Sequence, residues 1–335
     1  MPLFIVAARR LSCVPFRHTT QQGSSPVTGQ LDLDFSNDSP LCGAAKNERT
    51  LMAFNFFSLT REHQTELPRY DDGRHTIEVK GTSDGVANIW DKELLIYLES
   101  LMQERMNRGE VMSRTFRFTG HDFFRITGTK PAGSAYQRLE DSLTRLKSTT
   151  IKTNLLDDDG MGGRTQAFSW IDDFSIKWRK TKNGEKSMQA VSVEMGSRLY
   201  NAIINNKRML TYDSRYFQLK PLEKRLYEIA RAHVGEQPGF KMGIEKLRLR
   251  VGWTSELRSF KAHLLKISER RNQLPGYAIS LVDPRIQRSL DAKKPKPTGR
   301  TPLKSYLVYF YRTDKLNALL PIERVPTLEE LGDDL

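Results

Sequence analysis

The residues between Trp253 and Arg271 combine hydrogen-bond donors and cations with a periodic apolar stripe. The apolar positions recur at helical spacing, at Leu257, Phe260, Leu264 and Ile267. This periodicity predicts an amphipathic helix from Thr254 to Arg271. The opposite side carries two serines and three cations, namely Ser255, Arg258, Ser259, Lys266 and Arg270. Such side chains contact base edges, and arginine pairs well with guanine. The chemistry predicted here is therefore recognition of nucleic acid.

The charge around this helix supports the same chemistry. The chain has a net charge of +13, and residues 236–315 hold 18 lysines and arginines against seven acidic residues. A proline-rich span at 283–302 carries six of these cations, at Arg285, Arg288, Lys293, Lys294, Lys296 and Arg300. We interpret it as a long basic wing that contacts the phosphate backbone. The alternative is an ordinary solvated, charged surface.

Motifs for catalysis are lacking. The six histidines form no H-x-H or H-E-x-x-H pair, and no phosphate-binding G-x-x-x-x-G-K-[ST] loop or G-x-S-x-G elbow occurs. Tyr136 and Tyr200 could serve as nicking tyrosines only with a metal triad, which the sequence does not supply. The only cysteines are Cys13 and Cys42, near the start of the chain. We therefore expect no enzymatic activity, no cofactor and no metal site.

The elements that must position the cationic helix form a recognisable layout. A shorter amphipathic segment, Gly243–Val251, precedes it, and Gly252 suits the position that ends a helix. Thr254 or Ser255 suits the N-cap of the next helix. Helix, short break and helix is a helix-turn-helix pattern, although any small helical domain could contain two such packed helices. A helix beginning at Pro221 precedes the pair, and strands are expected at 276–282 and 304–312.

A similar layout precedes it in the chain. Helices are expected at 91–107, 119–126 and 134–147, a strand at 111–118, and β-rich segments between 149 and 194. The outward face of the third helix carries Ser134, Gln137, Arg138 and Arg145. Asp141 also lies on this face and would repel phosphate. We therefore expect a shared role in DNA contact and dimerisation for this half. The fold class predicted is α+β, with two tandem winged-helix domains at 53–212 and 213–315.

The two ends of the chain differ from this body in composition. Residues 1–52 are expected to be a flexible extension, and 316–335 an acidic tail. Within the extension, the hexapeptide QLDLDF places Gln30, Leu33 and Phe35 in the Q-x-x-L-x-F pattern by which bacterial proteins dock on the replicative sliding clamp. An accidental match within a polar tail is the alternative. No apolar run is long enough to span a membrane, and a cytoplasmic bacterial protein is expected.

Several segments of the body resemble the RepA type of plasmid replication initiator, the replication initiator protein A family. The resemblance covers roughly residues 53–312. It rests on IWDKELLIYL at 89–98, SRTFRFTGHDFF at 113–124, YQRLEDSLTRLKSTTIKTN at 136–154, DSRYFQLKPLEKRLYEIARAH at 213–233 and LPGYAISL at 274–281.

This resemblance implies a tandem winged-helix protein that binds repeated sites, called iterons, in double-stranded plasmid origin DNA. It implies help in origin melting, recruitment of the host replicative helicase and host initiator protein, and a homodimer in equilibrium with a monomer. Repression of its own gene, with a part in copy control, is also implied, without a catalytic step. The alternatives are a winged-helix transcriptional repressor, a rolling-circle nicking enzyme and a protein-interaction scaffold.

Overall fold

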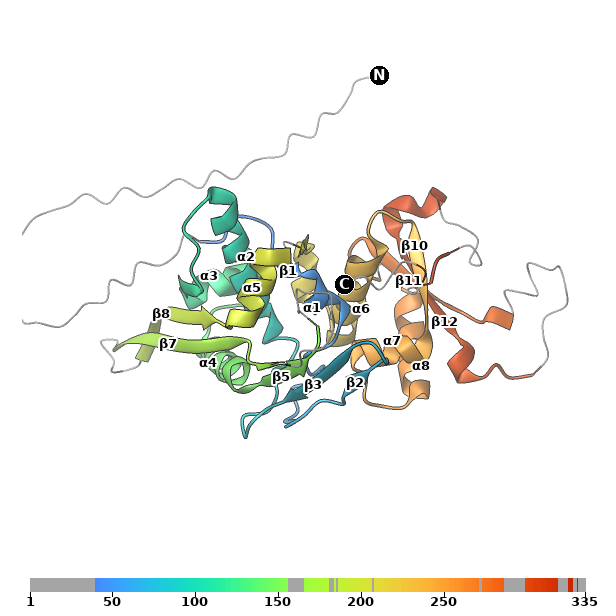
Figure 1. The fold of residues 1–335 in the computed structure, drawn as a ribbon, viewed down its shortest axis with the longest axis horizontal. Coiled ribbons are helices and arrows are strands. Elements are labelled where there is room, and N and C mark those ends of the chain that lie inside the picture. The colour runs from blue at the N-terminus through green and yellow to red at the C-terminus, as the bar shows by residue number, and fades with distance from the viewer. Residues whose placement is uncertain are drawn as a thin grey trace, which may run out of the picture. The chain divides into compact units, whose positions relative to one another are not determined.

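The computed structural model describes residues 40–155, 166–180, 184, 186–206, 208–270, 273–285, 299–318, 325–327 and 330. Helices and antiparallel strands alternate along this part of the chain, so the fold is mixed α/β (Figure 1). Two stretches, residues 92–195 and 221–312, follow one order of elements. We call them the first and second modules.

The first module contains three helices and a three-stranded sheet. Its elements are α2 (Lys92–Arg108), β4 (Thr115–Phe118), α3 (Gly120–Thr127), α4 (Gly133–Ser148), β7 (Ile171–Lys180) and β8 (Lys186–Met195). Strand β8 pairs with both β4 and β7, giving the order β4-β8-β7. Two further strands lie between α4 and β7 in the chain, and they join a separate sheet of order β2-β3-β5-β6. The strands of this sheet are β2 (Tyr70–Asp71), β3 (Thr76–Lys80), β5 (Thr150–Thr153) and β6 (Gln166–Phe168).

The second module repeats the arrangement without the added strands. Its elements are α6 (Pro221–Val234), β10 (Gly239–Gly243), α7 (Ile244–Val251), α8 (Leu257–Ser268), β11 (Tyr277–Val282) and β12 (Leu307–Arg312). The last strand again pairs with the other two, in the order β10-β12-β11. Each module therefore has a helix, a strand, two helices and two final strands, with the final strand at the centre of its sheet.

Local sequence signals explain several element boundaries. The Thr119 hydroxyl accepts a hydrogen bond from the Asp122 amide and caps α3. Pro221 stands at the first position of α6, where a missing N–H leaves no intrahelical bond unmade. Gly252 ends α7 with φ +79°, in the left-handed region that favours glycine, as the sequence predicts. Gly128 ends α3 in the same way, with φ +69°.

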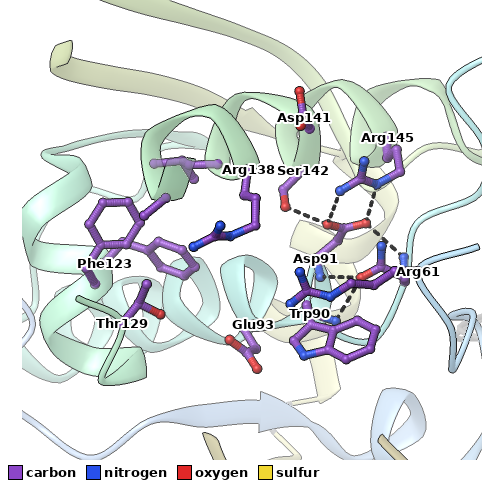
Figure 2. Close-up of a pocket in the computed structure, with 14 residues that line it drawn as sticks. Arg61, Trp90, Asp91, Glu93, Phe123, Thr129, Arg138, Asp141, Ser142 and Arg145 are labelled. Atoms are coloured by element: carbon purple, nitrogen blue, oxygen red, sulfur yellow. Dashed lines mark hydrogen bonds and ion pairs between the residues drawn. The ribbon is translucent and has the colours of Figure 1, made fainter. Parts of the chain in front are cut away.

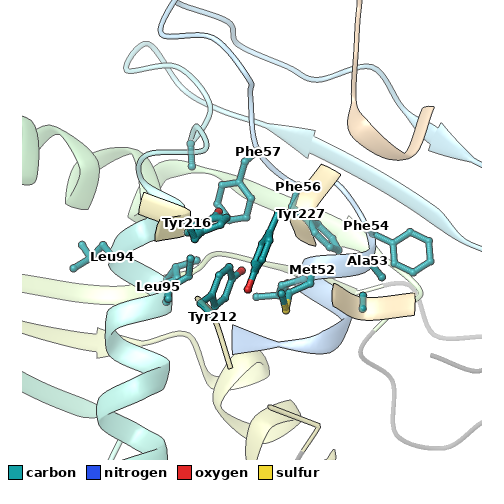
Figure 3. Close-up of a cluster of buried hydrophobic side chains, with 14 of the residues drawn as sticks. Met52, Ala53, Phe54, Phe56, Phe57, Leu94, Leu95, Tyr212, Tyr216 and Tyr227 are labelled. Carbon is teal, nitrogen blue, oxygen red and sulfur yellow. The ribbon is translucent and has the colours of Figure 1, made fainter. Parts of the chain in front are cut away.

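Residues 46–52 belong to the folded core, which corrects the expectation of a flexible extension reaching residue 52. Strand β1 (Lys46–Glu48) pairs with β9 (Met209–Thr211), and helix α1 (Arg49–Ala53) packs against α6. Apolar burial explains this, because Leu51, Met52 and Ala53 have no exposed surface. Figure 3 shows the side chains of α1 among aromatic residues that precede and follow the start of α6. Strand β1 lies before Met52, the second methionine of the sequence, so a chain translated from Met52 would lack this strand.

One smaller prediction also differs from the structure. The strand expected from residue 111 begins at Thr115, and Val111 is 95% exposed, so nothing holds it in a sheet. Before α6, residues Ser214–Gln218 form a 3-10 helix, η1, at whose start the Asp213 side chain accepts a hydrogen bond from the Arg215 amide. The remaining elements are α5 (Ser197–Asn206), η2 (Leu303–Ser305) and η3 (Thr313–Ala318).

The first helices of the two modules share a buried network of charges. Lys92, on α2, lies 2.7 Å from Glu228, on α6, and neither side chain is exposed. Arg225 also pairs with Glu228, and the hydroxyls of Tyr212 and Tyr216 donate to it at 2.9 and 2.7 Å. Burial opposes ionisation of Glu228, but the two cations outweigh burial and lower its pKa. The network is therefore ionic, and it joins the modules through their cores.

No helix in the described part of the chain is both long and apolar enough to cross a membrane.

Candidate nucleic-acid interface

Helix α8 has the two faces that its sequence predicts. Phe260, Leu264 and Ile267 are buried, while Arg258 and Lys266 lie on the exposed side. The helix begins at Leu257 and not at Thr254, and its N-cap is Glu256, which makes no side-chain capping bond. Neither predicted N-cap residue therefore serves as the cap.

The remaining predicted residues of this helix lie in different settings. Ser255 is exposed in the turn before the helix, where its carbonyl accepts a hydrogen bond from Arg248 Nη1 at 3.2 Å. Ser259 is half-buried. Arg270 follows the end of the helix and donates to Glu223 Oε1 at 2.8 Å. Arg270 thus anchors this end of the helix to the start of α6.

One hollow brings the helix and the predicted wing together. It measures about 510 Å³ and is lined by Glu256, Leu257 and Arg258 on one side and by residues 300–303 on the other. Arg258 and Arg300, predicted in separate elements, therefore border a single depression. Within the described residues, neither guanidinium has an ion-pair partner, so both cations can take a phosphate or a base edge.

Arg285 supports the base of the predicted wing. Its Nη2 donates to the Gly299 carbonyl at 3.2 Å and to the Thr301 hydroxyl, which in turn donates to Asp283. These bonds tie the two ends of the segment together, so this guanidinium is engaged within the protein. The other predicted wing cations, Arg288, Lys293, Lys294 and Lys296, lie outside the described residues.

Helix α4 of the first module presents fewer available cations. Ser134, Gln137 and Arg138 are exposed, as predicted, but Gln137 donates to Asp141 at 3.0 Å. Arg145 corrects the prediction of an outward cation: its Nε and Nη2 donate to the two oxygens of buried Asp91 at 2.7 and 2.8 Å. Those hydrogen bonds raise the pKa of Arg145. Arg145 thus holds α4 against the start of α2.

The hairpin of β7 and β8 carries a cluster of cations that was not among the predicted DNA contacts. Residues 177–186 contain five lysines and arginines and one glutamate, and Trp178 is 39% exposed. Trp178 and Lys186 line a hollow of about 600 Å³ together with Gln137 of α4. The density of cations between the two strands was the available sequence signal for a second wing.

Two further predictions concern a metal site and the sliding clamp. Among the described residues, no group of three or more His, Cys, Asp or Glu side chains is placed to hold a metal ion. The predicted clamp-binding residues Gln30, Leu33 and Phe35 lie outside the described part of the chain.

Comparisons with known proteins find similarity over most of the chain. A family model described as replication initiator protein A matches residues 46–279. A putative replication protein from Wigglesworthia glossinidia brevipalpis is 36% identical over 247 residues, which cover 73% of this chain and 88% of that protein. A crystal structure of domains 2 and 3 of RctB aligns with a TM-score of 0.55 at 14% identity, covering 79% of this chain and 98% of that one. The last likeness bears on the fold alone.

Proposed function

The chain belongs to the replication initiator protein A family, and we propose that it is a DNA-binding initiator of plasmid replication that acts without a catalytic step of its own. We assign each module as a winged helix, with α4 and α8 as recognition helices and the β7–β8 hairpin and the 283–302 segment as wings. The shared sheet order, with the final strand central, supports this assignment.

The observation that carries the proposal is the meeting of Arg258 and Arg300 at one hollow. A helix entering the major groove needs base-contacting side chains at its exposed start, and a wing beside it needs cations for the adjacent backbone. Arg258 stands in the first turn of α8 and Arg300 at the end of the wing segment. The second module therefore supplies the principal contact with repeated origin sites.

Binding to direct-repeat origin DNA across a salt series tests this proposal. A protein that neutralises several phosphates loses affinity steeply as salt rises, by about 10³-fold or more between 50 and 200 mM when six or more phosphates are contacted. We expect a specific shifted complex with such a slope. A complex that forms equally on unrelated DNA, or an affinity that does not change with salt, would refute the assignment.

Partners beyond DNA form the second part of the proposal. We infer recruitment of the host helicase and host initiator protein, help in origin melting, a dimer that represses the gene for this protein and participates in copy control, and a monomer that binds iterons in the bacterial cytoplasm. A plasmid carrying the origin, maintained only when the gene is supplied in trans, distinguishes an initiator from a repressor.

The sliding clamp is proposed as a further partner through Gln30, Leu33 and Phe35. Replacing Leu33 and Phe35 together by alanine removes both apolar anchors of the motif. We expect loss of clamp pull-down with origin binding intact. Retained pull-down would show that the hexapeptide is an accidental match.

A further inference from the structure

A pocket of about 500 Å³ opens in the first module between the start of α2 and helices α3 and α4. It is separate from the hollow that Arg258 and Arg300 line. Its apolar wall contains Phe123, Phe124 and Leu139, all largely buried. Figure 2 shows Phe123 on one side of this space and Trp90 on the other, with Arg138 extending from α4 between them. A pocket of this volume is large enough for a small organic ligand.

Three polar groups in the pocket have no hydrogen-bonding partner within the described residues. Glu93 accepts a hydrogen bond from Lys224 at Oε1, whereas its Oε2 accepts none. The indole Nε1 of Trp90 donates to no group, and Arg138 makes no ion pair. Asp91, in contrast, is satisfied by Arg145, the Ser142 hydroxyl and the Asn88 amide. Trp90, Glu93 and Arg138 all line the pocket, so a ligand there would meet residues with unused polar groups.

A second cation of the pocket, Arg61, lies over the aromatic ring of Trp90. The guanidinium carbon of Arg61 lies 4.3 Å from the centroid of the Trp90 ring. Aromatic rings and guanidinium planes are the surfaces on which nucleic-acid bases stack. Arg61 and Arg138 together bring two positive charges to a space that also has an acceptor, Glu93, at its edge.

We propose that this pocket binds one nucleotide whose base carries an exocyclic amino group. The base packs between the stacked Arg61–Trp90 pair and Phe123, and its amino group donates to Glu93 Oε2, as carboxylates accept from the amino group of cytosine. Arg138 then pairs with the phosphate. The same chemistry is offered by a free mononucleotide and by an unpaired nucleotide within a DNA strand.

The base preference follows from the acceptor. Cytosine, adenine and guanine each carry an amino group, whereas thymine does not and would leave Glu93 facing a carbonyl oxygen. We expect dCMP, dAMP and dGMP to bind the full chain about tenfold or more tightly than dTMP, because a mismatched buried acceptor loses a charge-assisted hydrogen bond. Isothermal titration calorimetry with each mononucleotide measures this difference.

Two variants and a control locate the site. Arg138→Ala removes the phosphate contact from an exposed position on α4, and Trp90→Leu removes the stacking ring. Each should weaken dCMP binding by about tenfold or more while the thermal unfolding of the protein stays near that of the wild type. Lys130→Ala is the matched control, because Lys130 is exposed nearby and does not line the pocket. Its affinity for dCMP should be unchanged.

The source of the nucleotide is determined with short single strands. Oligo(dC) binding much more tightly than dCMP, and losing affinity in Arg138→Ala, assigns the pocket to an unpaired nucleotide of a strand. Equal affinity for both probes assigns it to free nucleotides. The proposal is overturned if neither probe binds saturably, if dTMP binds as tightly as dCMP, or if Arg138→Ala binds like the wild type.

Duplex origin binding is measured in parallel in the same variants. Trp90 takes no part in the proposed duplex contacts, so Trp90→Leu should bind origin duplex normally while losing dCMP. If the wild-type protein does not bind origin duplex, the initiator proposal is refuted. The pocket proposal is then still tested separately, because dCMP binding is measured independently of duplex binding.

Discussion

The two modules share one order of elements, yet they place their arginines in different ways. On α8 of the second module, Arg258 is exposed and has no ion-pair partner within the described residues. On α4 of the first module, Arg145 is bound through two hydrogen bonds to Asp91, and the amide of Gln137 is held by Asp141. Arg258 is thus presented to solvent by its helix, whereas Arg145 anchors its helix within the protein.

This difference shows that corresponding helices in a repeated fold need not carry equivalent functions. A cation contributes to DNA affinity when it can release counterions on binding phosphate. A cation already paired with a buried carboxylate must first give up that pair, so its net contribution is smaller. We therefore expect the second module to dominate duplex binding, while the first supplies its basic hairpin and its pocket.

The largest effect should come from the buried network that joins the modules. Lys92→Met leaves Glu228 with one cation instead of two in a site with no exposure. Removing one partner of a buried ion pair typically destabilises a protein by about 3–5 kcal/mol. Because Lys92 and Glu228 lie on the first helices of the two modules, both modules should unfold together at lower urea, which circular dichroism would follow.

Lys147→Ala is the control for that change. Lys147 pairs with Asp173 at 2.5 Å, and both side chains are substantially exposed, so losing the pair should leave the urea midpoint close to that of the wild type. A Lys92→Met protein as stable as this control would contradict the view that the modules share a core.

The buried carboxylates of the two modules should respond differently to pH. Burial raises the pKa of Glu99, on α2. Burial also raises the pKa of Glu48 to about 7. The two residues are in contact, because the backbone amide of Glu48 donates a hydrogen bond to the Glu99 carboxylate. Glu228, on α6, has a lowered pKa because its cations outweigh burial. The folded protein therefore holds a proton on Glu48 that the unfolded chain releases above its ordinary pKa of 4.5.

The free energy of unfolding should consequently fall as pH rises from about 4.5 to about 7, by roughly 3 kcal/mol from Glu48. Glu48→Gln keeps an acceptor without a titrating proton and should make this slope less steep, leaving the contribution of Glu99, as urea unfolding at several pH values would show. Glu62→Gln, at an exposed position, should leave it unchanged. An equal slope in the Glu48→Gln protein would place the titration elsewhere.

Periodicity predicted the helices of both modules because apolar spacing reports directly on burial, but it did not predict strand β10. The buried stripe of α8 at Phe260, Leu264 and Ile267 follows from sequence alone, as does the end of α7 at Gly252. Residues 46–52 were missed because a short polar-flanked segment has no period to detect. Its burial depends on segments distant in the chain, namely strand β9 and helices α2 and α6.

The candidate sites were less accessible to sequence reasoning than the fold. Spacing placed Arg145 on the outer side of α4, but it could not show that Asp91, more than fifty positions earlier, reaches the same guanidinium. Likewise, the hollow shared by Arg258 and Arg300 exists because residues 300–303 lie beside the start of α8, although they are more than thirty positions later in the chain. Pairing between distant segments decides which cations are available, and a single sequence does not record it.

Substituting one arginine in each module should sharpen the contrast in DNA binding. Arg258→Ala should weaken binding to origin duplex by about 1–3 kcal/mol and relax the preference at one base pair, if its guanidinium contacts guanine. Arg145→Ala should instead lower stability and change specificity little, because it releases Asp91 inside the protein. Selection from randomised duplexes measures specificity in both. If Arg145→Ala loses base preference and Arg258→Ala does not, the first module, and not the second, dominates duplex binding.

The smallest expected effect compares the glycines that end α3 and α7. Both have positive φ, so alanine at either position is disfavoured by roughly 1–2 kcal/mol. At Gly252 the added methyl would also overlap the side chain of Asn55, whereas at Gly128 it meets only the mobile amide of Gln218 at 2.8 Å. Gly109→Ala reports the backbone contribution alone, since its φ is +68° and no atom lies within 4 Å of an added methyl. Thermal unfolding should therefore rank Gly252→Ala as most destabilising, with Gly128→Ala near Gly109→Ala. Equal losses at Gly252 and Gly128 would show that Asn55 moves aside, and that the turn before α8 is no more tightly packed than its counterpart before α4.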